Sequence, residues 1–355
     1  MDEYEDTLLV LVNQTLDLMW PLALFFILLL TYPPLAVWRC VRWLFTFPWP
    51  MQDRVVLITG ASSGIGEHIA YEYARLGARL ALVARREERL EEVEDNCKSL
   101  GSPDVQIIQA DVSKEEDCKQ VVEETVQHFQ RLDTLLLNAG VAHIYSFEEA
   151  DDTKGFGPIM DVNFWGYVYT TKFALPHLRR SQGQIVVNDS IVSFLPQAKT
   201  SIYNASKAAV SQFFETLRVE LGSAVPITVF LPGAIKSEMT DGKVLLPDGK
   251  VASPDEAFRL RNEAGFGLFP LLPTSALARR VVKAARYRRP RVVIPSWYKT
   301  MFYLKIFEPE LLYTSLRIFW SGRPSFAKRL SEIFGGGIKP PGPKEFERGG
   351  FRKDE

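Results

Sequence analysis

Residues 54–66 read R-V-V-L-I-T-G-A-S-S-G-I-G, and they decide the class of fold. Arg54 to Thr59 is an apolar run of strand length, and a glycine-rich loop leads from it into a helix that we expect from about Ile65 to Leu76. Glycines let the main chain turn tightly and approach a pyrophosphate, whose negative charge suits the N-terminus of a helix. The stretch therefore predicts a strand–loop–helix junction that binds a dinucleotide.

Apolar strands and helices keep alternating beyond this junction. We expect further strands at 80–84, 105–110, 134–137, 184–187 and 227–231, with helices such as 115–130 and 159–178 between them. Apolar strands that alternate with helices indicate a parallel sheet covered on both faces, which is an α/β fold.

Composition narrows the class of protein. The 355 residues carry a net charge of −1 and 24% charged side chains, which is typical of an ordinary globular surface and argues against a nucleic-acid partner. The three cysteines, Cys40, Cys97 and Cys118, are too few and too scattered for a disulfide framework or a metal site.

The N-terminal region is far more apolar than the rest. From Leu18 to Trp38 no residue is charged, and these 21 residues would cover about 31 Å as a helix, roughly one bilayer core. Pro21, Pro33 and Pro34 lie inside the stretch and are expected to break or kink it. An acidic start and the lack of a small-residue cleavage site argue against a cleaved signal peptide. We therefore expect an anchor, either a tilted span or a proline-tipped hairpin in one lipid leaflet.

Three residues in the second half of the chain indicate a chemistry. Tyr203 and Lys207 are four residues apart, so on a helix the phenol and the ammonium share one face. A nearby cation favours the phenolate and lowers the pKa of the tyrosine, which lets the phenol exchange a proton near neutral pH. Ser190 would hold the substrate oxygen. The alternative is a chance Y-x-x-x-K on an exposed helix, and the dinucleotide loop upstream argues against it.

The end of the second expected strand bears on the choice of cofactor. A dinucleotide without a 2′-phosphate usually meets an acidic residue there, but this strand ends in Ala84 and is followed by Arg85 and Arg86. Guanidinium groups pair with phosphate, whereas a carboxylate would repel it, so NADP(H) is favoured. The alternative is that the two arginines only begin a solvated helix.

From about Gln52 to Glu238 the chain resembles the short-chain dehydrogenase/reductase family. The markers that carry the resemblance are T-G-A-S-S-G-I-G, Asp111-Val112, Asn138-Ala139-Gly140, Asn163, Ser190, Tyr203, Lys207 and Pro232-Gly233. The resemblance implies a Rossmann-like, doubly wound parallel sheet of seven strands, often in a homodimer.

The same resemblance implies a role for each matched residue. Ser190 would polarise the substrate oxygen, Tyr203 would be the general acid/base, and Lys207 would lower the tyrosine pKa and hold the nicotinamide ribose. Asn163 would retain a water that relays protons. The cofactor would be held by Gly60, Ser62, Ser63, Gly64, Ile65 and Gly66 in the loop, by Arg85 and Arg86, by Asp111 and Val112 at the adenine, by Asn138 at the ribose side, and by Tyr203, Lys207, Pro232 and Ile235 near the nicotinamide.

Within the family, the anchor together with D-V-N-F-W-G-Y-V-Y-T-T, Y-N-A-S-K-A-A and P-S-W-Y resembles the plant 11-beta-hydroxysteroid dehydrogenase-like enzymes, the steroleosins of oil bodies. That resemblance implies NADP(H) and sterol or steroid substrates. Three departures from the family pattern are Leu137 in the N-N-A-G turn, Ser237 in place of threonine, and Asn188-Asp189 before Ser190. Asp189 adds a carboxylate that could alter substrate polarity or raise the tyrosine pKa.

The C-terminal part of the chain is less regular. We expect a long loop over the active site at 240–272, and the arginines and lysines of 279–291 belong either to a solvated helix end or to a contact with an anionic membrane surface. The aromatic stretch at 297–320 could cover the substrate pocket, form a dimer face or lie on lipid. We divide the chain into an anchor at 1–50, a catalytic NADP-binding domain at 51–295, an aromatic amphipathic segment at 296–334 and a disordered tail at 335–355.

Together these patterns predict an NADP(H)-dependent oxidoreductase that interconverts a secondary alcohol and a ketone on a sterol- or steroid-like lipid. We expect a homodimer at a lipid droplet (oil body) or endoplasmic reticulum membrane, with a cytosolic catalytic domain, no metal and no nucleic-acid partner. The alternatives are a structural or signalling lipid-droplet protein with little turnover, and a reductase of long-chain acyl or sphingoid ketones.

Overall fold

A computed structural model describes residues 2–150, 152–236, 244–246, 250, 252–253, 256 and 271–321. Two compact units make up the chain, Met1–Pro48 and Trp49–Glu355. The expected tail at 335–355, Ser237 and most of the expected loop at 240–272 lie outside the described residues.

The first unit consists of one helix, α1 (Asp2–Leu44). The three prolines lie inside this helix without ending it, so the expected break at Pro33 and Pro34 does not occur. Each proline removes only one donor from the hydrogen-bond ladder, and helix-forming leucines surround all three. From Leu8 to Val41 the helix has a mean hydropathy of 1.8 and buries none of its side chains. By length and composition it could cross a membrane, although N-terminal signal sequences share these properties.

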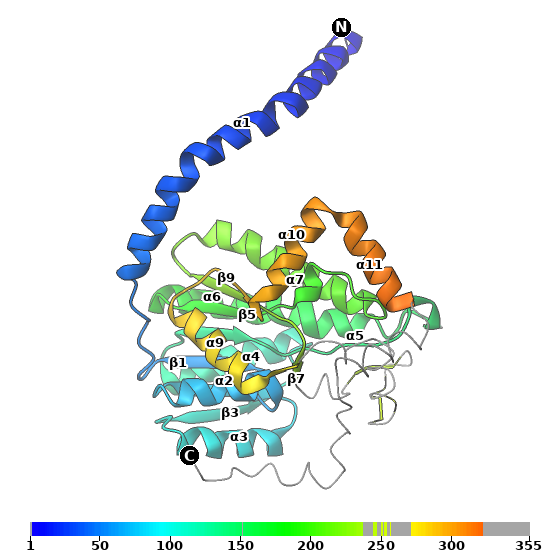
Figure 1. Cartoon of the computed structure of the whole chain (residues 1–355). Coiled ribbons are helices and arrows are strands. Elements are labelled where there is room, and N and C mark those ends of the chain that lie inside the picture. Colours follow the sequence, from blue (N-terminus) through cyan, green and yellow to red (C-terminus); the bar gives the residue numbers. More distant parts are fainter. Residues whose placement is uncertain are drawn as a thin grey trace. The chain divides into compact units, whose positions relative to one another are not determined.

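The second unit is built on a seven-stranded sheet in the order β3-β2-β1-β4-β5-β6-β9, in which every neighbouring pair is parallel (Figure 1). Its strands are β1 (Val55–Thr59), β2 (Arg79–Ala84), β3 (Val105–Gln109), β4 (Thr134–Leu137), β5 (Gln184–Asn188), β6 (Ile227–Pro232) and β9 (Arg291–Ile294). The predicted doubly wound parallel sheet is confirmed. The order reverses between β1 and β4, which is where ligands bind in such sheets.

Helices cover both faces of the sheet (Figure 1). One face carries α2 (Gly64–Ala74), α3 (Glu87–Ser99) and α9 (Thr274–Arg286), and the other carries α4 (Glu115–Phe129), α6 (Gly166–Ser181) and α7 (Ser201–Leu221). Successive residues of a strand point to opposite faces, so in β1 Val56 and Ile58 join the first core while Val55 and Leu57 join the second. This double burial explains why the strands are continuous apolar runs.

After β9 the chain forms η5 (Ser296–Tyr298), α10 (Lys299–Phe307) and α11 (Pro309–Ser321). Helix α10 packs on the loop after β5, where the rings of Phe194 and Phe302 have centroids 4.6 Å apart. Lys305 strengthens this contact, because its Nζ lies 4.5 Å from the centre of the Phe194 ring and donates to the Phe194 carbonyl. This position favours a role for α10 in covering the region around Ser190. The dimer and lipid alternatives for the segment stay predictions.

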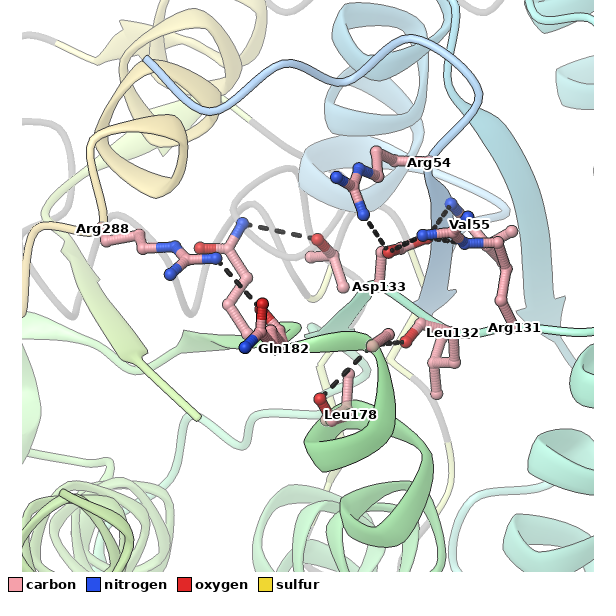
Figure 2. A network of polar contacts seen from close by, with 11 residues as sticks. Arg54, Val55, Arg131, Leu132, Asp133, Leu178, Gln182 and Arg288 are labelled. Atoms are coloured by element: carbon pink, nitrogen blue, oxygen red, sulfur yellow. Dashed lines mark hydrogen bonds and ion pairs between the residues drawn. The ribbon is translucent and has the colours of Figure 1, made fainter. Parts of the chain in front are cut away.

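Asp133 links two strands at the edge of the sheet where the strands begin, and its side chain is fully buried (Figure 2). Arg54 Nη1 donates to Oδ1 (2.8 Å), and Arg131 donates from Nε to Oδ2 (2.7 Å) and from Nη2 to Oδ1 (2.8 Å). The N–H of Val55 adds a fourth bond, to Oδ2 (3.0 Å). Burial alone would raise the pKa of Asp133, but these donors hold it below its ordinary value. One carboxylate thereby ties the start of β1 to the start of β4.

Candidate active site

The predicted site residues gather at the opposite edge of the sheet, where the strands end. The glycine loop follows β1, Arg85 and Arg86 follow β2, Asp111 and Val112 follow β3, Asn138 follows β4, Ser190 follows β5, and Pro232 ends β6. Because the carboxyl ends of parallel strands meet at one edge, residues spread over most of the catalytic unit line a single site.

The glycine loop between β1 and α2 has the form that a pyrophosphate needs. Gly60 has φ +67, in the left-handed region, and a Cβ there would lie 2.7 Å from the Cα of Ala139. A Cβ on Gly66 would lie 2.3 Å from the carbonyl oxygen of Gly60. Only glycine fits at these two positions, and the tight turn that they allow leads directly into the N-terminus of α2, where a pyrophosphate would be favoured.

Asn138 holds this loop in place. Its Nδ2 donates to the carbonyls of Gly60 (3.1 Å) and Thr59 (3.3 Å), and its Oδ1 accepts from Nδ2 of Asn188 at the end of β5 (2.8 Å). The side chain thus links the loop to the strand that leads to Ser190. Its expected contact with the ribose side of the cofactor stays a prediction.

Arg86 brings a cation to the same loop. Its Nη2 donates to the hydroxyls of Ser62 (3.1 Å) and Ser63 (2.9 Å), immediately before α2. Arg85 is exposed beside it. The end of β2 therefore offers guanidinium groups at the position where a carboxylate would select against a 2′-phosphate.

The other predicted cofactor residues have structural partners as well. Asp111 accepts at Oδ1 from the N–H (3.1 Å) and hydroxyl (2.9 Å) of Ser113, which shapes the turn into α4. Val112 is nearly buried, and a Cβ on Gly166 would lie 2.7 Å from its carbonyl oxygen. Pro232 ends β6, and Ile235 begins the short strand β7 (Ile235–Lys236). All lie at or just beyond the strand ends.

The structure brings Ser190, Tyr203 and Lys207 together. Ser190 follows β5, and the other two lie in the first two turns of α7. Ser190 lies close enough to the phenol of Tyr203 to lower its pKa, and its hydroxyl accepts from the N–H of Val192 (3.3 Å). Lys207 is almost fully buried, and its Nζ donates to the carbonyl of Asn188 (2.8 Å).

Tyr167 is a further member of this cluster that the sequence patterns did not identify. Its hydroxyl donates to the same Asn188 carbonyl (3.2 Å), and its ring centre lies 5.1 Å from Nζ of Lys207. An aromatic face at this distance attracts a cation. A usable signal existed, because Tyr167 is four residues after Asn163, the spacing of neighbours on one helix face.

The pKa values differ from the expectation. Burial raises the pKa of Tyr203 to about 12; the hydrogen bond from Ser190 opposes this rise, and the charge of Asp189 adds to it. Burial also lowers the pKa of Lys207 to about 8, against the attraction of Asp189. The lowered tyrosine pKa expected from the Tyr–Lys pair is therefore not found, because burial of the phenol itself has the largest effect on its pKa. A phenol with this pKa is protonated at neutral pH.

Asp189 is the departure from the family pattern with the clearest electrostatic effect. It is 2% exposed, its Oδ2 accepts from the hydroxyl of Ser193 (2.9 Å), and its Oδ1 has no hydrogen-bond partner within the described part of the chain. Burial raises its pKa to about 6, and the charge of Lys207 limits the rise. Its charge in turn raises the pKa of Tyr203, as the sequence suggested.

Asn163 connects the helix that precedes α6 to the loop after β4 and to α7. It is fully buried in η2 (Asp161–Trp165), a π-helical turn that leads into α6. Its Oδ1 accepts from the N–H of Val141 (2.8 Å), and its Nδ2 donates to the Val141 carbonyl (2.9 Å) and to the hydroxyl of Ser206 (2.9 Å). Both N–H donors of the amide are thus used by protein atoms, and its oxygen accepts one bond. The expected role of Asn163 in retaining a water stays a prediction.

His143 is a second residue that the sequence patterns did not identify, and no local signal points to it. It is fully buried in the loop after β4, and its Nε2 accepts from the N–H of Ile202 (3.1 Å) in the first turn of α7. Thr200, the N-cap residue of α7, makes no side-chain cap of its own. Burial lowers the pKa of His143 to about 4, so the ring is neutral and can accept. His143 therefore caps the helix that carries Tyr203.

Comparison with known proteins agrees with this geometry. The short-chain dehydrogenase family model matches residues 54–245. The chain is a short-chain dehydrogenase. It is thus an oxidoreductase of that family, and the resemblance found in the sequence is confirmed.

Relatives of this short-chain dehydrogenase include plant proteins named 11-beta-hydroxysteroid dehydrogenase. The protein from Pinus massoniana is 45% identical over 86% of this chain and 85% of its own length, and protein A from Sesamum indicum is 43% identical over 92% of both chains. Among solved structures, an alcohol dehydrogenase from the archaeon Thermococcus sibiricus, complexed with 5-hydroxy-NADP, has a TM-score of 0.56 and 28% identity. That match covers 68% of this chain and 94% of the archaeal one.

Proposed function

We propose that this short-chain dehydrogenase uses NADP(H) to interconvert a ketone and a secondary alcohol on a sterol- or steroid-like lipid. The assembly of Ser190, Tyr203 and Lys207 at the strand ends, beside the glycine loop, carries the proposal. The plant relatives named hydroxysteroid dehydrogenase support the substrate class. The apolar surface of α1 supports a location at a membrane or lipid droplet. Arg39 and Arg42 follow the uncharged stretch, which favours a catalytic unit in the cytosol.

The choice of NADP(H) rests on Arg86 and on the close-packed glycine loop. Gly60 and Gly66 let the loop turn and pack tightly before α2, and Arg86 would pair with a 2′-phosphate at the end of β2. When bound, the nicotinamide ring supplies or accepts the hydride. We expect Arg86→Ala to weaken binding of NADPH about 10- to 100-fold and to leave binding of NADH within about twofold. Titration calorimetry with both nucleotides measures this, and equal losses for both would argue against the assignment.

The residues around the substrate oxygen perform the proton transfer. Ser190 orients and polarises the carbonyl oxygen, and Tyr203 donates its phenolic proton to that oxygen as hydride reaches the carbonyl carbon. In the reverse direction the tyrosine oxygen receives the proton. Because the pKa of Tyr203 is about 12, the phenol carries its proton at neutral pH, which favours the direction of ketone reduction. Lys207 and Tyr167 fix the geometry through the Asn188 carbonyl.

Aromatic side chains support a bulky apolar substrate. Phe194 follows the short helix η3 (Ile191–Ser193) after Ser190, and Phe302 of α10 packs on it. Leu195 and Phe302 are only partly buried against the core of this face. An apolar wall beside the catalytic serine suits a ring system better than a small polar alcohol.

We also expect a homodimer, which is testable by mass photometry in detergent.

The first test is hydride transfer from tritium-labelled NADPH to a panel of keto-steroids and long-chain ketones. We expect label in a steroid alcohol, and none with the Tyr203→Phe variant, which retains the nucleotide site. Label in long-chain alcohols alone would replace the substrate class by long-chain ketones. Tight NADPH binding without transfer to any member would favour a lipid-droplet protein with little turnover.

A further inference from the structure

A group of arginines lies at the edge where the strands begin, away from the catalytic residues. Arg54 precedes β1, Arg131 precedes β4, Arg179 and Arg180 end α6 before β5, and Arg288 and Arg289 precede β9. Arg288 also donates from Nη2 to the carbonyl of Gln182 (3.0 Å), which joins its side chain to the end of α6 (Figure 2). We call these six residues the arginine edge.

Few acidic groups oppose the arginine edge. Asp133 pairs with Arg54 and Arg131, and no ion pair is found for the other four arginines within the described ranges. Two closed pairs lie farther along the same edge, Arg79 with Asp53 (3.5 Å) and Arg291 with Glu215 (2.7 Å), and these add no net charge. Glu220, near the end of α7, is an exposed acid. The arginine edge therefore keeps a net positive charge.

Two of these cations contact a single aromatic ring. The guanidinium carbons of Arg54 and Arg288 are 4.9 Å and 4.7 Å from the centre of the Trp49 indole. Burial lowers the pKa of Arg288, and the charge of Arg54 lowers it further. A bound anion would relieve the repulsion between these two like charges.

Helix dipoles do not account for the whole group. Cations in the last turn of a helix are stabilised by the carbonyl ends, and this explains Arg179 and Arg180 in α6. Arg54 and Arg131 lie between elements, and Arg288 and Arg289 follow the end of α9. The group therefore has a cause other than helix capping.

The chain connection to α1 indicates that lipid headgroups are the anions nearest to the arginine edge. Trp49 enters the catalytic unit beside the arginine edge, where its N–H donates to the carbonyl of Arg286 (2.7 Å). Only residues 45–48 separate it from Leu44, the end of α1, a distance of at most about 18 Å. An anchor in lipid thus restricts how far the arginine edge can move from the lipid surface.

We propose that the arginine edge binds the headgroups of anionic phospholipids at the surface that holds α1. This proposal rests on the membrane anchor of the proposed function. Each basic residue near such a surface changes the ratio of docked to undocked catalytic units about fivefold, and salt screens the effect.

The test uses the full chain in lipid nanodiscs. Cys40→Ser with Gln130→Cys leaves one accessible thiol beside Arg131, since Cys97 and Cys118 are buried. A donor dye on that thiol and acceptor dyes on lipid headgroups report proximity by energy transfer. We expect more transfer with about 30% phosphatidylserine than with phosphatidylcholine alone, and loss of the gain at about 0.5 M salt.

A matched pair of variants assigns the gain to the arginine edge. Arg180→Gln with Arg289→Gln removes two of its cations and should lower the docked-to-undocked ratio about 25-fold. Lys114→Gln with Lys119→Gln removes the same charge from exposed positions at the start of α4, at the other edge, and should keep the gain. Equal transfer in both lipids, or a gain that the arginine variant keeps, would overturn the proposal. Co-elution with the nanodisc shows separately that the anchor holds, and NADPH turnover shows separately that the enzyme works; without co-elution both the anchor and the docking proposal fail.

Discussion

The two edges of the sheet each bury one carboxylate, and they treat it in opposite ways. At the beginning of the strands, Asp133 receives bonds from two arginines and a main-chain N–H, and its pKa is lowered. At the ends of the strands, Asp189 is also buried but has one oxygen without a partner in the described structure, and its pKa is raised to about 6. Donors, not burial alone, decide the charge of a buried acid. At the beginning of the strands, the fully hydrogen-bonded carboxylate contributes to stability. At the ends of the strands, the incompletely bonded carboxylate lies among groups that can exchange protons.

The largest expected effect is at the catalytic edge. Tyr203→Phe removes the only atom of that side chain that can donate a proton, so we expect turnover to fall by about 10²- to 10⁴-fold. NADPH affinity and thermal stability should change little, because the ring still fills its place in α7. Single-turnover kinetics with a keto-steroid and calorimetric NADPH titration test the two halves. Turnover within tenfold of the parent would show that another group supplies the proton.

The matching experiment at the edge where the strands begin is the substitution Asp133→Ala. It leaves Arg54 and Arg131 without their buried partner, so we expect a loss of about 3–5 kcal/mol in the free energy of unfolding. Urea unfolding of the detergent-solubilised chain measures it, with Arg75→Ala as a control, because Arg75 has only an exposed pair with Glu72. A loss below about 1 kcal/mol would mean that the network is not a stabilising element.

The pH dependence of this stability has a definite sign. The folded-state pKa of Asp133 is lowered, so its contribution is present above the unfolded pKa of an ordinary carboxyl group and is lost as pH falls through the lowered folded pKa. Unfolding experiments at acid pH should therefore show a smaller difference between the parent and Asp133→Ala than experiments at neutral pH. A difference that grows with acidity would contradict the assignment.

Local patterns predicted much of the fold. Six of the seven strands follow from short apolar runs, and the shared face of Tyr203 and Lys207 follows from the helical period of 3.6 residues, which each short segment reveals by itself. Strand β9 was missed because its four residues, Arg291–Ile294, directly follow a run of arginines that reads as a charged surface.

What the sequence did not predict depends on partners far along the chain. Arg54 and Asp133 are 79 residues apart, and His143 and Ile202 are 59 residues apart, so no local pattern connects them. The same holds for burial, which sets the pKa of Tyr203 and Lys207 after the helices have packed. The four-residue spacing predicted that the side chains of Tyr203 and Lys207 share a face, but it did not predict how far they are shielded from solvent.

A smaller effect is expected from the cap that His143 provides for α7. His143→Leu removes the acceptor for the Ile202 N–H and should destabilise the chain by about 1 kcal/mol. Because Tyr203 is the next residue, kcat should fall several-fold while KM for NADPH stays constant. His143→Gln can restore an acceptor and should recover part of both losses. Equal kcat values for the Leu and Gln variants would reduce His143 to a packing residue.

The finest test of the two carboxylates is Asp189→Asn, which removes the charge and keeps the shape. The charge of Asp189 raises the pKa of Tyr203 and of Lys207, so both values should fall in the variant. In alcohol oxidation, where the tyrosine oxygen must accept a proton, the rise of kcat/KM with pH should therefore shift to lower pH. The pH profiles of parent and variant, recorded with one steroid alcohol, measure the shift.

Stability gives an independent readout of the same substitution. The folded-state pKa of Asp189 is raised, so its contribution is fully present below the unfolded pKa and is lost as pH rises through about 6. This sign is opposite to that of Asp133. As pH rises through about 6, the stability of Asp189→Asn relative to the parent should rise. That of Asp133→Ala should stay constant in this range and should recover relative to the parent only as pH falls below the ordinary carboxyl value of 3.8. If both variants showed the same trend, the two carboxylates would have the same charge behaviour, and the contrast between the edges would rest on geometry alone.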